Sequence, residues 1–358
     1  MVASVRIGAL FPMVQTSGNF DQSGMLRLGA FLLALKEINN KTDGVADWLL
    51  PNTHLQFVLR DSRRDDLSAL VGALELLGSC SSSKISTQGI VAAVGAASSG
   101  PSESAAKAFA QARVPQISYS STSPRLSDGS ESGFPFFLRT PPSDAFQAEA
   151  MVDVLSNLFN YTHIATVRST DSYGMHGISE FSQRWAALNR TILTSQSFSS
   201  GETDFSLVYR ELQRVRARVI VLFCQANEAG RFLRGAHESG VGGSGWLVFG
   251  SDAVSSSGTW LGDDRLSSDT ALRHKVLRGF FGMAPSNGAG TPRYEAYRDR
   301  FVQFSPTVLP RIDTATPGTA SAVACDVGAT LAASPAWNMT DADVRTPNLV
   351  TSDFKPYA

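Results

Sequence analysis

Short apolar runs alternate with longer helical patterns along most of the chain. Runs rich in β-branched and apolar residues predict strands over residues 5–11, 54–61, 89–96, 114–120, 163–169, 219–224, 245–252 and 279–285. Apolar residues spaced three and four apart predict helices over 24–40, 66–79, 103–113, 145–159, 177–189, 205–217 and 228–240. In the first helix the buried stripe is expected to comprise Met25, Leu28, Phe31, Leu32 and Leu35. This alternation predicts an α/β fold built from doubly wound parallel sheets.

The pattern falls into two blocks. The first ends near Arg139, where "FFLRTPPSD" contains two prolines that interrupt any continuing element. The second begins with the helix after Asp144. Ligands of doubly wound sheets bind at loops that follow the strands. The stretch "SYSSTSPRLSDGS" follows the predicted strand 114–120, so we expect it to lie where a ligand binds rather than to be a linker.

Composition excludes some partners and leaves others open. A chain of 358 residues with 43% hydrophobic residues can bury a sizeable core, and a net charge of -1 gives no basic excess for nucleic acid. The three cysteines, Cys80, Cys224 and Cys325, show no CxxC spacing, and Cys224 falls in the apolar run "VIVLFC" of a core strand. The sequence contains neither a transmembrane segment nor a signal-peptide pattern. These features fit a soluble chain and fit equally a domain cut from a longer one.

Catalytic and cofactor motifs are not apparent. The five histidines are scattered, "GAASSG" does not match GxSxG, and a P-loop is missing. The stretch "GVGGSG" at 240–245 matches GxGxxG, but it precedes a strand and opens no helix, so we interpret it as a turn. We therefore expect no enzyme activity, no catalytic residue, no metal and no cofactor. An α/β enzyme acting on a small carboxylate stays open as an alternative.

Several polar loops carry a family resemblance: "GAASSGPS", "SYSSTSPRLSD", "STDSYGMHG" and "GSD", with "FFLRTPPSDAFQAEAM" and "GETDFSLVYREL". From Val5 to about Ala336 the chain resembles the type I periplasmic-binding-protein fold. It is most similar to the Venus-flytrap ligand-binding region of class C G-protein-coupled receptors of the metabotropic glutamate type. The resemblance implies two lobes that close over a small ligand. Its implied boundaries are 1–140 for the first part of lobe 1, 141–282 for lobe 2, 283–345 for a return to lobe 1 and 346–358 for a ragged tail.

The resemblance implies that lobe 1 holds the carboxylate of an amino acid or similar small zwitterion. The matching positions are Ser98 and Ser99 in "GAASSG" and Ser120, Ser121 and Thr122 in "SYSST". Hydroxyls and amides at a helix N-terminus can bind an anion without a full counter-charge. The same residues could instead cap helices or form hydroxyl turns.

The resemblance further assigns Asp144 in "PPSD", Tyr173 in "DSYGMHG" and Asp252 in "FGSD" to the ammonium group. Carboxylates and an aromatic face suit a buried cation. As alternatives, Asp144 could cap a helix and Tyr173 could pack in the core. Arg27 matches a basic position for the ligand side chain, although it could be a solvated helix residue. The stretch "TATPGTAS" lacks the second basic residue of glutamate-type members, so only the grip on the amino-acid backbone is well matched.

The resemblance also implies where the protein is located and how it assembles. We expect an extracellular receptor domain whose only membrane attachment is through segments absent from this chain, and which ends before the family's last crossover. Sequons at Asn40, Asn160, Asn189 and Asn338 suit glycosylation. The helices 66–79 and 103–112 flank the face through which receptors of this family pair, so a homodimer through lobe 1 is possible. A periplasmic-type carrier that delivers amino acids to a transporter and a natriuretic-type receptor ectodomain are the alternatives.

Overall fold

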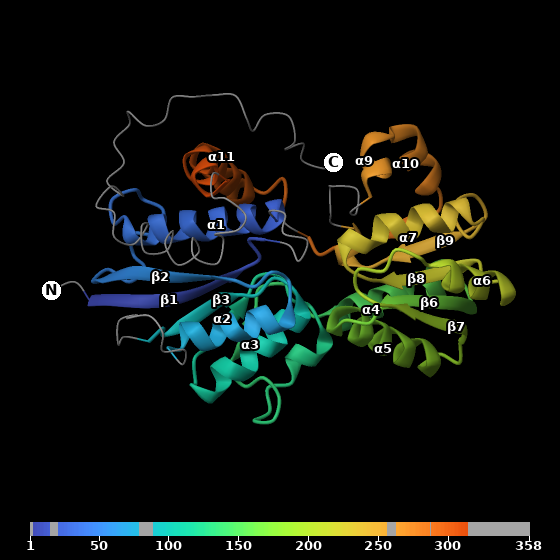
Figure 1. Cartoon of the computed structure of the whole chain (residues 1–358), viewed down its shortest axis with the longest axis horizontal. Helices are drawn as coiled ribbons and strands as arrows, with labels where there is room; N and C mark the ends of the chain where they lie inside the picture. The colour runs from blue at the N-terminus through green and yellow to red at the C-terminus, as the bar shows by residue number, and fades with distance from the viewer. Residues whose placement is uncertain (1–2, 15–20, 79–88, 256–262, 287, 314–358) are drawn as a thin grey trace. The chain divides into compact units, whose positions relative to one another are not determined.

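The structure, a computed structural model, describes residues 3–14, 21–78, 89–255, 263–286 and 288–313. Backbone contacts divide the chain into two compact units (Figure 1). Unit 1 draws on Met1–Ser121, Gly129–Thr140 and Ser286–Ala358, and unit 2 on Thr122–Asp128 and Pro141–Pro285. The sequence therefore moves from one unit to the other after Ser121, Asp128, Thr140 and Pro285.

Unit 1 contains five parallel strands in the order β2-β1-β3-β4-β5. The strands are β1 (Ala3–Phe11), β2 (Thr53–Asp61), β3 (Ala92–Gly95), β4 (Gln116–Ser118) and β5 (Phe137–Arg139). The helices are α1 (Gln22–Asn39), α2 (Asp66–Leu76), α3 (Ser99–Gln111) and α11 (Pro292–Asp313). Parallel pairing requires a crossover between strands, and α1, α2 and α3 supply the first crossovers.

The core of unit 1 has one layer on each face of this sheet. Successive residues of a strand point to opposite faces, so Phe11 packs in a cluster with α1 and α11, whereas Leu10 packs with α2 and α3. The stripe expected on the first helix is confirmed in Met25, Leu28, Leu32 and Leu35, which are buried, while Phe31 is half-buried. Both faces of the sheet are thus covered, as an all-parallel sheet requires.

Unit 2 contains a second sheet of five parallel strands, in the order β10-β9-β8-β6-β7. Its strands are β6 (His163–Ser169), β7 (Thr191–Phe198), β8 (Val219–Phe223), β9 (Leu247–Gly250) and β10 (Phe280–Gly282). Its helices are α4 (Asp144–Asp153), α5 (Ser172–Ala187), α6 (Ser206–Arg214), α7 (Ala226–Glu238), α8 (Asp252–Ser255), α9 (Asp264–Ser268) and α10 (Thr270–Val276). A 3₁₀ turn, η1 (Pro124–Ser127), and a π-helical turn, η2 (Val154–Leu158), complete the unit. The α/β class with parallel sheets is therefore confirmed.

The central strand of unit 2 explains the continuous apolar run in the sequence. All five residues of β8 are buried, because β8 lies between β9 and β6 and has a core layer on each face. Cys224, directly after β8, is buried and free, which confirms the interpretation as a core residue. On α5, a Cβ at Gly177 would lie 2.4 Å from the Phe223 ring. Glycine there allows the helix to approach β8 closely.

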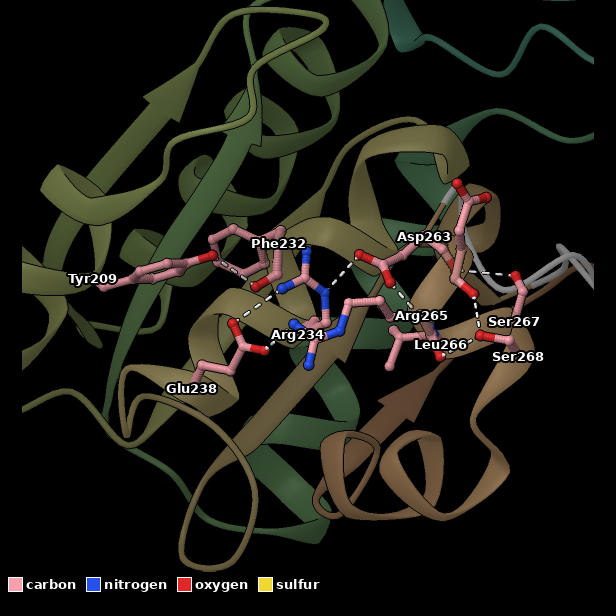
Figure 2. Close-up of polar contacts among 10 residues, drawn as sticks. Tyr209, Phe232, Arg234, Glu238, Asp263, Arg265, Leu266, Ser267 and Ser268 are labelled. Atoms are coloured by element: carbon pink, nitrogen blue, oxygen red, sulfur yellow. Dashed lines mark hydrogen bonds and ion pairs between the residues drawn. The ribbon is translucent and has the colours of Figure 1, made fainter.

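An ion-pair network joins α7 to α9 on the surface of unit 2 (Figure 2). Arg234 Nε donates to Asp263 Oδ2 at 2.8 Å, and Arg234 Nη1 donates to Glu238 Oε2 at 3.0 Å. Glu238 Oε1 also accepts from Arg265 Nη1 at 3.0 Å. Asp263 caps α9 by accepting from the Leu266 amide at 3.0 Å. The network occupies the carboxylate of Glu238 at the end of α7.

Several elements differ from the sequence expectation. The strand β7, with the sequence "TILTSQSF", lies at the sheet edge and exposes polar residues, so it lacks the apolar run used to find strands. The short edge strand β5 and the helix α11 were not predicted either. The helices α3 and α5 begin at Ser99 and Ser172, four and five residues before their predicted starts. The polar loop residues of those starts belong to the first helical turns.

Several sequence expectations fall outside the described residues, among them Cys80, Cys325, Asn338 and the tail 346–358. Within the ranges that are described, no helix combines the length and apolar character needed to cross a membrane. In the same ranges, no three His, Cys, Asp or Glu side chains are grouped as a metal ion would require.

Candidate ligand-binding site

Polar side chains of unit 1 gather at the carboxyl ends of β3 and β4, which are neighbours in the sheet. Ser98 and Ser99 follow β3, and Ser120 and Ser121 follow β4. Because the carboxyl ends of parallel strands meet at one edge, the two loops are adjacent. Ser99 and Ser121 are buried, whereas Ser98 and Ser120 are half-buried.

Two serines that the sequence analysis missed, Ser102 and Ser118, hold these loops together. Ser118 Oγ donates to the Ala96 carbonyl at 2.8 Å and accepts from the Ser121 amide at 3.0 Å. Ser102 Oγ lies 2.8 Å from Ser121 Oγ. The three serines are fully buried, so these bonds are shielded from water. The network therefore orders both loops without a ligand. The role of these two serines was not evident from the sequence, because Ser102 lies inside a helix and Ser118 at the end of a strand.

The helix α3 starts directly at the first loop. Ser98 is its N-cap residue, but the Ser98 side chain makes no capping hydrogen bond. The amides of a first helical turn have no partners within the helix. They also carry the positive end of the helix dipole, which favours an anion.

Arg27 of α1 lies against an aromatic stack in unit 1. Its guanidinium carbon is 5.8 Å from the centre of the Tyr119 ring, and this ring stacks on Phe11 with centroids 4.9 Å apart. Arg27 Nη1 and the Tyr119 hydroxyl are buried and have no hydrogen-bond partner among the described residues. Burial lowers the pKa of Arg27 below its usual value. Buried polar groups normally find partners, so this corner can accept a group that offers hydrogen-bond acceptors.

A second arginine near this corner is already neutralised. Arg64 forms an ion pair with Asp21, and Arg64 Nη2 donates to Ser23 Oγ at 2.5 Å. Asp21 also caps α1 by accepting from the Gly24 amide at 2.8 Å. Burial would raise the pKa of Asp21, but the hydrogen bond and charge of Arg64 and the Gly24 amide hold it below its usual value. Within the described part of the chain, Arg64 is thus paired with a carboxylate, whereas Arg27 forms no ion pair.

In unit 2, Tyr173 and Asp252 form a direct pair. Tyr173 lies in the first turn of α5, and its hydroxyl donates to Asp252 Oδ1 at the start of α8. The same hydroxyl accepts from the Ala253 amide at 3.3 Å. The Tyr173 ring packs in the core, 5.9 Å from the Phe223 ring centre. The alternative that Tyr173 packs in the core is thus confirmed, and the bond between its hydroxyl and Asp252 was not expected from the sequence.

Asp144 adds a second carboxylate to this group. Burial raises the pKa of Tyr173 far above its usual value, and the negative charges of Asp252 and Asp144 add to the shift. Asp144 is buried at the first position of α4. Ser143, not Asp144, is the N-cap of α4, with its hydroxyl accepting from the Ala145 amide at 3.3 Å. The alternative that Asp144 caps the helix is therefore wrong. The Asp144 amide donates to the Thr122 carbonyl at 2.8 Å, which brings Thr122 to the same place.

Comparisons with known proteins identify the family. The sequence model described as "Receptor family ligand binding region" matches residues 26–311. The chain belongs to this family. It is 30% identical over 275 residues to metabotropic glutamate receptor 4 of Macaca fascicularis, and 31% identical over 276 residues to that receptor of Mus musculus and of Rattus norvegicus. These alignments cover 70% of this chain and 29% of each receptor.

The chain thus spans under a third of the length of these receptors. As a member of this family, it is a receptor-type ligand-binding region. The relatives favour this interpretation over a transport carrier or a natriuretic-type ectodomain. Unit 1 carries the expected contacts Arg27, Ser98, Ser99, Ser120 and Ser121, and unit 2 carries Thr122, Asp144, Tyr173 and Asp252.

One buried acidic residue near the strand ends of unit 2 was missed by the sequence analysis. Glu228, in the first turn of α7, accepts from the Gly201 amide at 2.9 Å through Oε1, while Oε2 is buried without a hydrogen-bond partner in the described structure. Burial raises the pKa of Glu228 above its usual value, and nearby Asp171 adds to the shift. Its position after "FCQAN" resembled a helix surface, so the pattern gave no signal of burial.

Glu228 makes the stability of unit 2 dependent on pH. Because its pKa is raised on folding, the folded chain binds the proton more tightly than the unfolded chain. The free energy of unfolding should therefore fall as pH rises from about 4.3, the usual value, through the raised value. The variant Glu228→Gln keeps the shape and cannot titrate, so urea unfolding across pH 4–8 should show a flatter fall.

Glu202 provides the matched control. Amide hydrogen bonds from Asp204 and Thr203 lower its pKa, so its contribution to stability is lost as pH falls. Glu202→Gln should change the pH dependence in the opposite sense to Glu228→Gln. Unchanged pH dependence in Glu228→Gln would show that Glu228 does not hold its proton in the folded chain.

Proposed function

We propose that this chain binds a free α-amino acid, with unit 1 holding the carboxylate and unit 2 holding the ammonium of one ligand molecule. The observation that carries the proposal is a group of two carboxylates and a phenol in unit 2, in which Asp144 and Tyr173 are buried and Asp252 is half-buried. Negative charge gathered in a buried place is costly unless a cation compensates it. The chain resembles receptors that are named for glutamate, which is consistent with an amino-acid ligand.

The carboxylate end is supported by the ordered serine loops of unit 1. Ser102 and Ser118 use their own hydroxyls to fix the loops, which leaves the positive N-terminal end of α3 and its N-cap residue Ser98 to meet an anion. Thr122, next in the chain, would add a hydroxyl from unit 2. Such neutral donors bind a carboxylate without introducing a competing charge.

The side-chain end is supported by Arg27. Its Nη1 and the neighbouring Tyr119 hydroxyl are buried donors without partners in the described residues. A ligand whose side chain ends in an acceptor would satisfy them. Because Arg64 is paired with Asp21, Arg27 is the guanidinium we assign to this end.

Binding then acts as a signal by shifting the equilibrium between arrangements of the units. A ligand that contacts both units stabilises the arrangement in which both contacts are made, by its differential affinity for that arrangement. In this proposal the chain catalyses no reaction, and the output lies in the rest of a membrane receptor.

Calorimetric titration with a panel of amino acids tests the site. Asp252→Asn removes a charged partner of the ammonium and should weaken binding about 10- to 100-fold, since hydrogen bonds to charged groups contribute about 1.5–3 kcal/mol. Thr122→Ala removes a neutral donor and should weaken binding about 2- to 10-fold. Ser179→Ala, at an exposed position of α5, is the control and should bind as the parent does. No heat with any amino acid, or equal affinity in Asp252→Asn, would contradict the proposal.

We place the binding region on the extracellular side of a membrane. Asn160 and Asn189 are exposed, and the Thr42 hydroxyl donates to Asn40 Oδ1 at 2.9 Å, so these three sequons are accessible at the surface or in a turn. If the chain is secreted, removal of N-glycans by glycosidase should increase its electrophoretic mobility.

A homodimer through unit 1 is the proposed assembly. The helix α2 buries Ala69, Ala73 and Leu76 in the core, and its outer side exposes Leu67 and Val71 by 67% and 42%. Exposed apolar residues one turn apart make a stripe that a second helix could cover.

Substitution of this stripe tests the dimer. Leu67→Lys with Val71→Lys should shift sedimentation toward the monomer, because a charge on each helix would have to be buried. Leu207→Lys, at a leucine of unit 2 that is 70% exposed, is the matched control. Equal sedimentation of all three chains would show that α2 is not the contact.

A further inference from the structure

The amino ends of the strands in unit 2 form an edge that the proposed amino-acid site does not use. Five loops lead into the strands there, at residues 159–162, 188–190, 215–218, 239–246 and 277–279. These loops contain four arginines, Arg190, Arg216, Arg218 and Arg278, and not one Asp or Glu. The whole chain carries a net charge of -1. Positive charge is therefore concentrated at this edge, although the net charge of the whole chain is slightly negative.

Sheet hydrogen bonds fix three of these loops in relation to one another. The Leu247 amide donates to the Arg218 carbonyl, and the Val248 amide donates to the Gly279 carbonyl, both at 2.9 Å. Strand β9 thus carries the Arg218 loop on one side and the Arg278 loop on the other. Neighbouring strands lie about 5 Å apart, so these two arginines stand about 10 Å apart along the edge. Arg190, before β7, continues the row two strands beyond β8.

Trp246 supports the middle of the row. The Arg218 guanidinium lies 4.7 Å from the centre of the Trp246 ring, and Trp246 is only 9% exposed. A guanidinium held on an aromatic face keeps its in-plane donors free for a planar or tetrahedral anion. Gly279 makes the packing possible, because a Cβ there would lie 2.0 Å from the Trp246 carbonyl oxygen.

The arginine side chains of this edge are accessible to an anion. Arg216, Arg218 and Arg278 are exposed, and none of them forms an ion pair in the part of the chain that is described. The carboxylates nearest in sequence are occupied: Glu211 pairs with Arg214, and Glu238 pairs with Arg234 and Arg265 (Figure 2). An approaching anion would thus meet arginines that have no competing carboxylate.

The glycine-rich loop 240–245 lies within this row, between α7 and β9. It has positive φ at Gly240, Gly243 and Gly245, and it opens no helix, which agrees with the expected turn. The loop brings neither a charge nor a large side chain to the edge. It therefore places no charge and no bulky side chain between Arg218 and Arg278, where a long chain could lie.

We propose that this edge of unit 2 binds a sulfated polysaccharide. Arginine pairs with tetrahedral oxyanions through two parallel N–H donors, and a row about 10 Å apart suits a linear polymer with repeated sulfates. Sulfated polysaccharides occur outside cells, where we place this chain. Asn160 and Asn189 belong to the loops before β6 and β7, so glycans there would still leave the β8 to β10 side open.

Surface plasmon resonance on immobilised heparin at about 0.15 M NaCl tests the proposal. The variant combines Arg216→Asn, Arg218→Gln and Arg278→Gln, with asparagine at 216 because φ is +54° there. Exposed charge pairs contribute about 0.2–1 kcal/mol each, so losing three should weaken binding about 3- to 100-fold. N-desulfated, O-desulfated heparin should not compete with heparin for the parent chain.

A control variant removes three positive charges from unit 1: Arg113→Asn, Lys107→Gln and Arg293→Gln. Arg113 is exposed with φ of +55°, as Arg216 is with +54°. This variant should bind heparin as the parent does. Equal weakening of heparin binding in both variants would show that only net charge matters, and it would overturn the proposal. No binding by the parent, or binding to phosphatidylserine vesicles in place of heparin, would also overturn it.

The result of the heparin test can be distinguished from the result of the amino-acid binding test. The edge variant should keep the calorimetric response of the parent to amino acids, which also shows that it folds. Heparin binding without any amino-acid response would refute the proposed function alone, and the reverse result would refute this inference alone.

Discussion

The parallel direction of the strands that the structure describes is the constraint on which the rest of this molecule depends. In each sheet it sends the loops that follow strands to one edge and the loops that precede strands to the other. In unit 2, Asp252 and Tyr173 follow strands, whereas Arg218 and Arg278 precede them. The candidate ligand-binding residues and the basic residues are thus separated to opposite edges of one sheet without any further device. A single topology supplies two surfaces with different chemistry.

Burial away from water determines which ligand group each half of the candidate site would favour. In unit 2, burial of Tyr173 beside two carboxylates makes the group unfavourable unless a cation or a shared proton compensates it. In unit 1, Arg27 is buried beside Tyr119, and both have donors without partners in the described structure. These burial costs are the physical reason to assign the two groups to a ligand, whereas Arg64, paired with Asp21, is structural.

Much of the fold followed from the sequence because buried strands and amphipathic helices have distinct periods. The run "VIVLFC" predicted β8, and the stripe on α1 predicted its buried face. The edge strand β7 escaped because "TILTSQSF" has one face in solvent and is mostly polar. Among site residues, Tyr173 and Asp252 were named, but their direct bond depends on two loops 79 residues apart. Ser102, Ser118 and Glu228 were missed, since their burial is set by packing rather than by any local pattern.

The central claim is that one amino acid engages both units and thereby changes their arrangement. Small-angle X-ray scattering of the chain, with and without a saturating amino acid, measures this change directly. We expect a smaller radius of gyration with ligand in the parent, and no change in Asp252→Asn under the same conditions. An amino acid that binds calorimetrically to the parent while the scattering stays the same would contradict it.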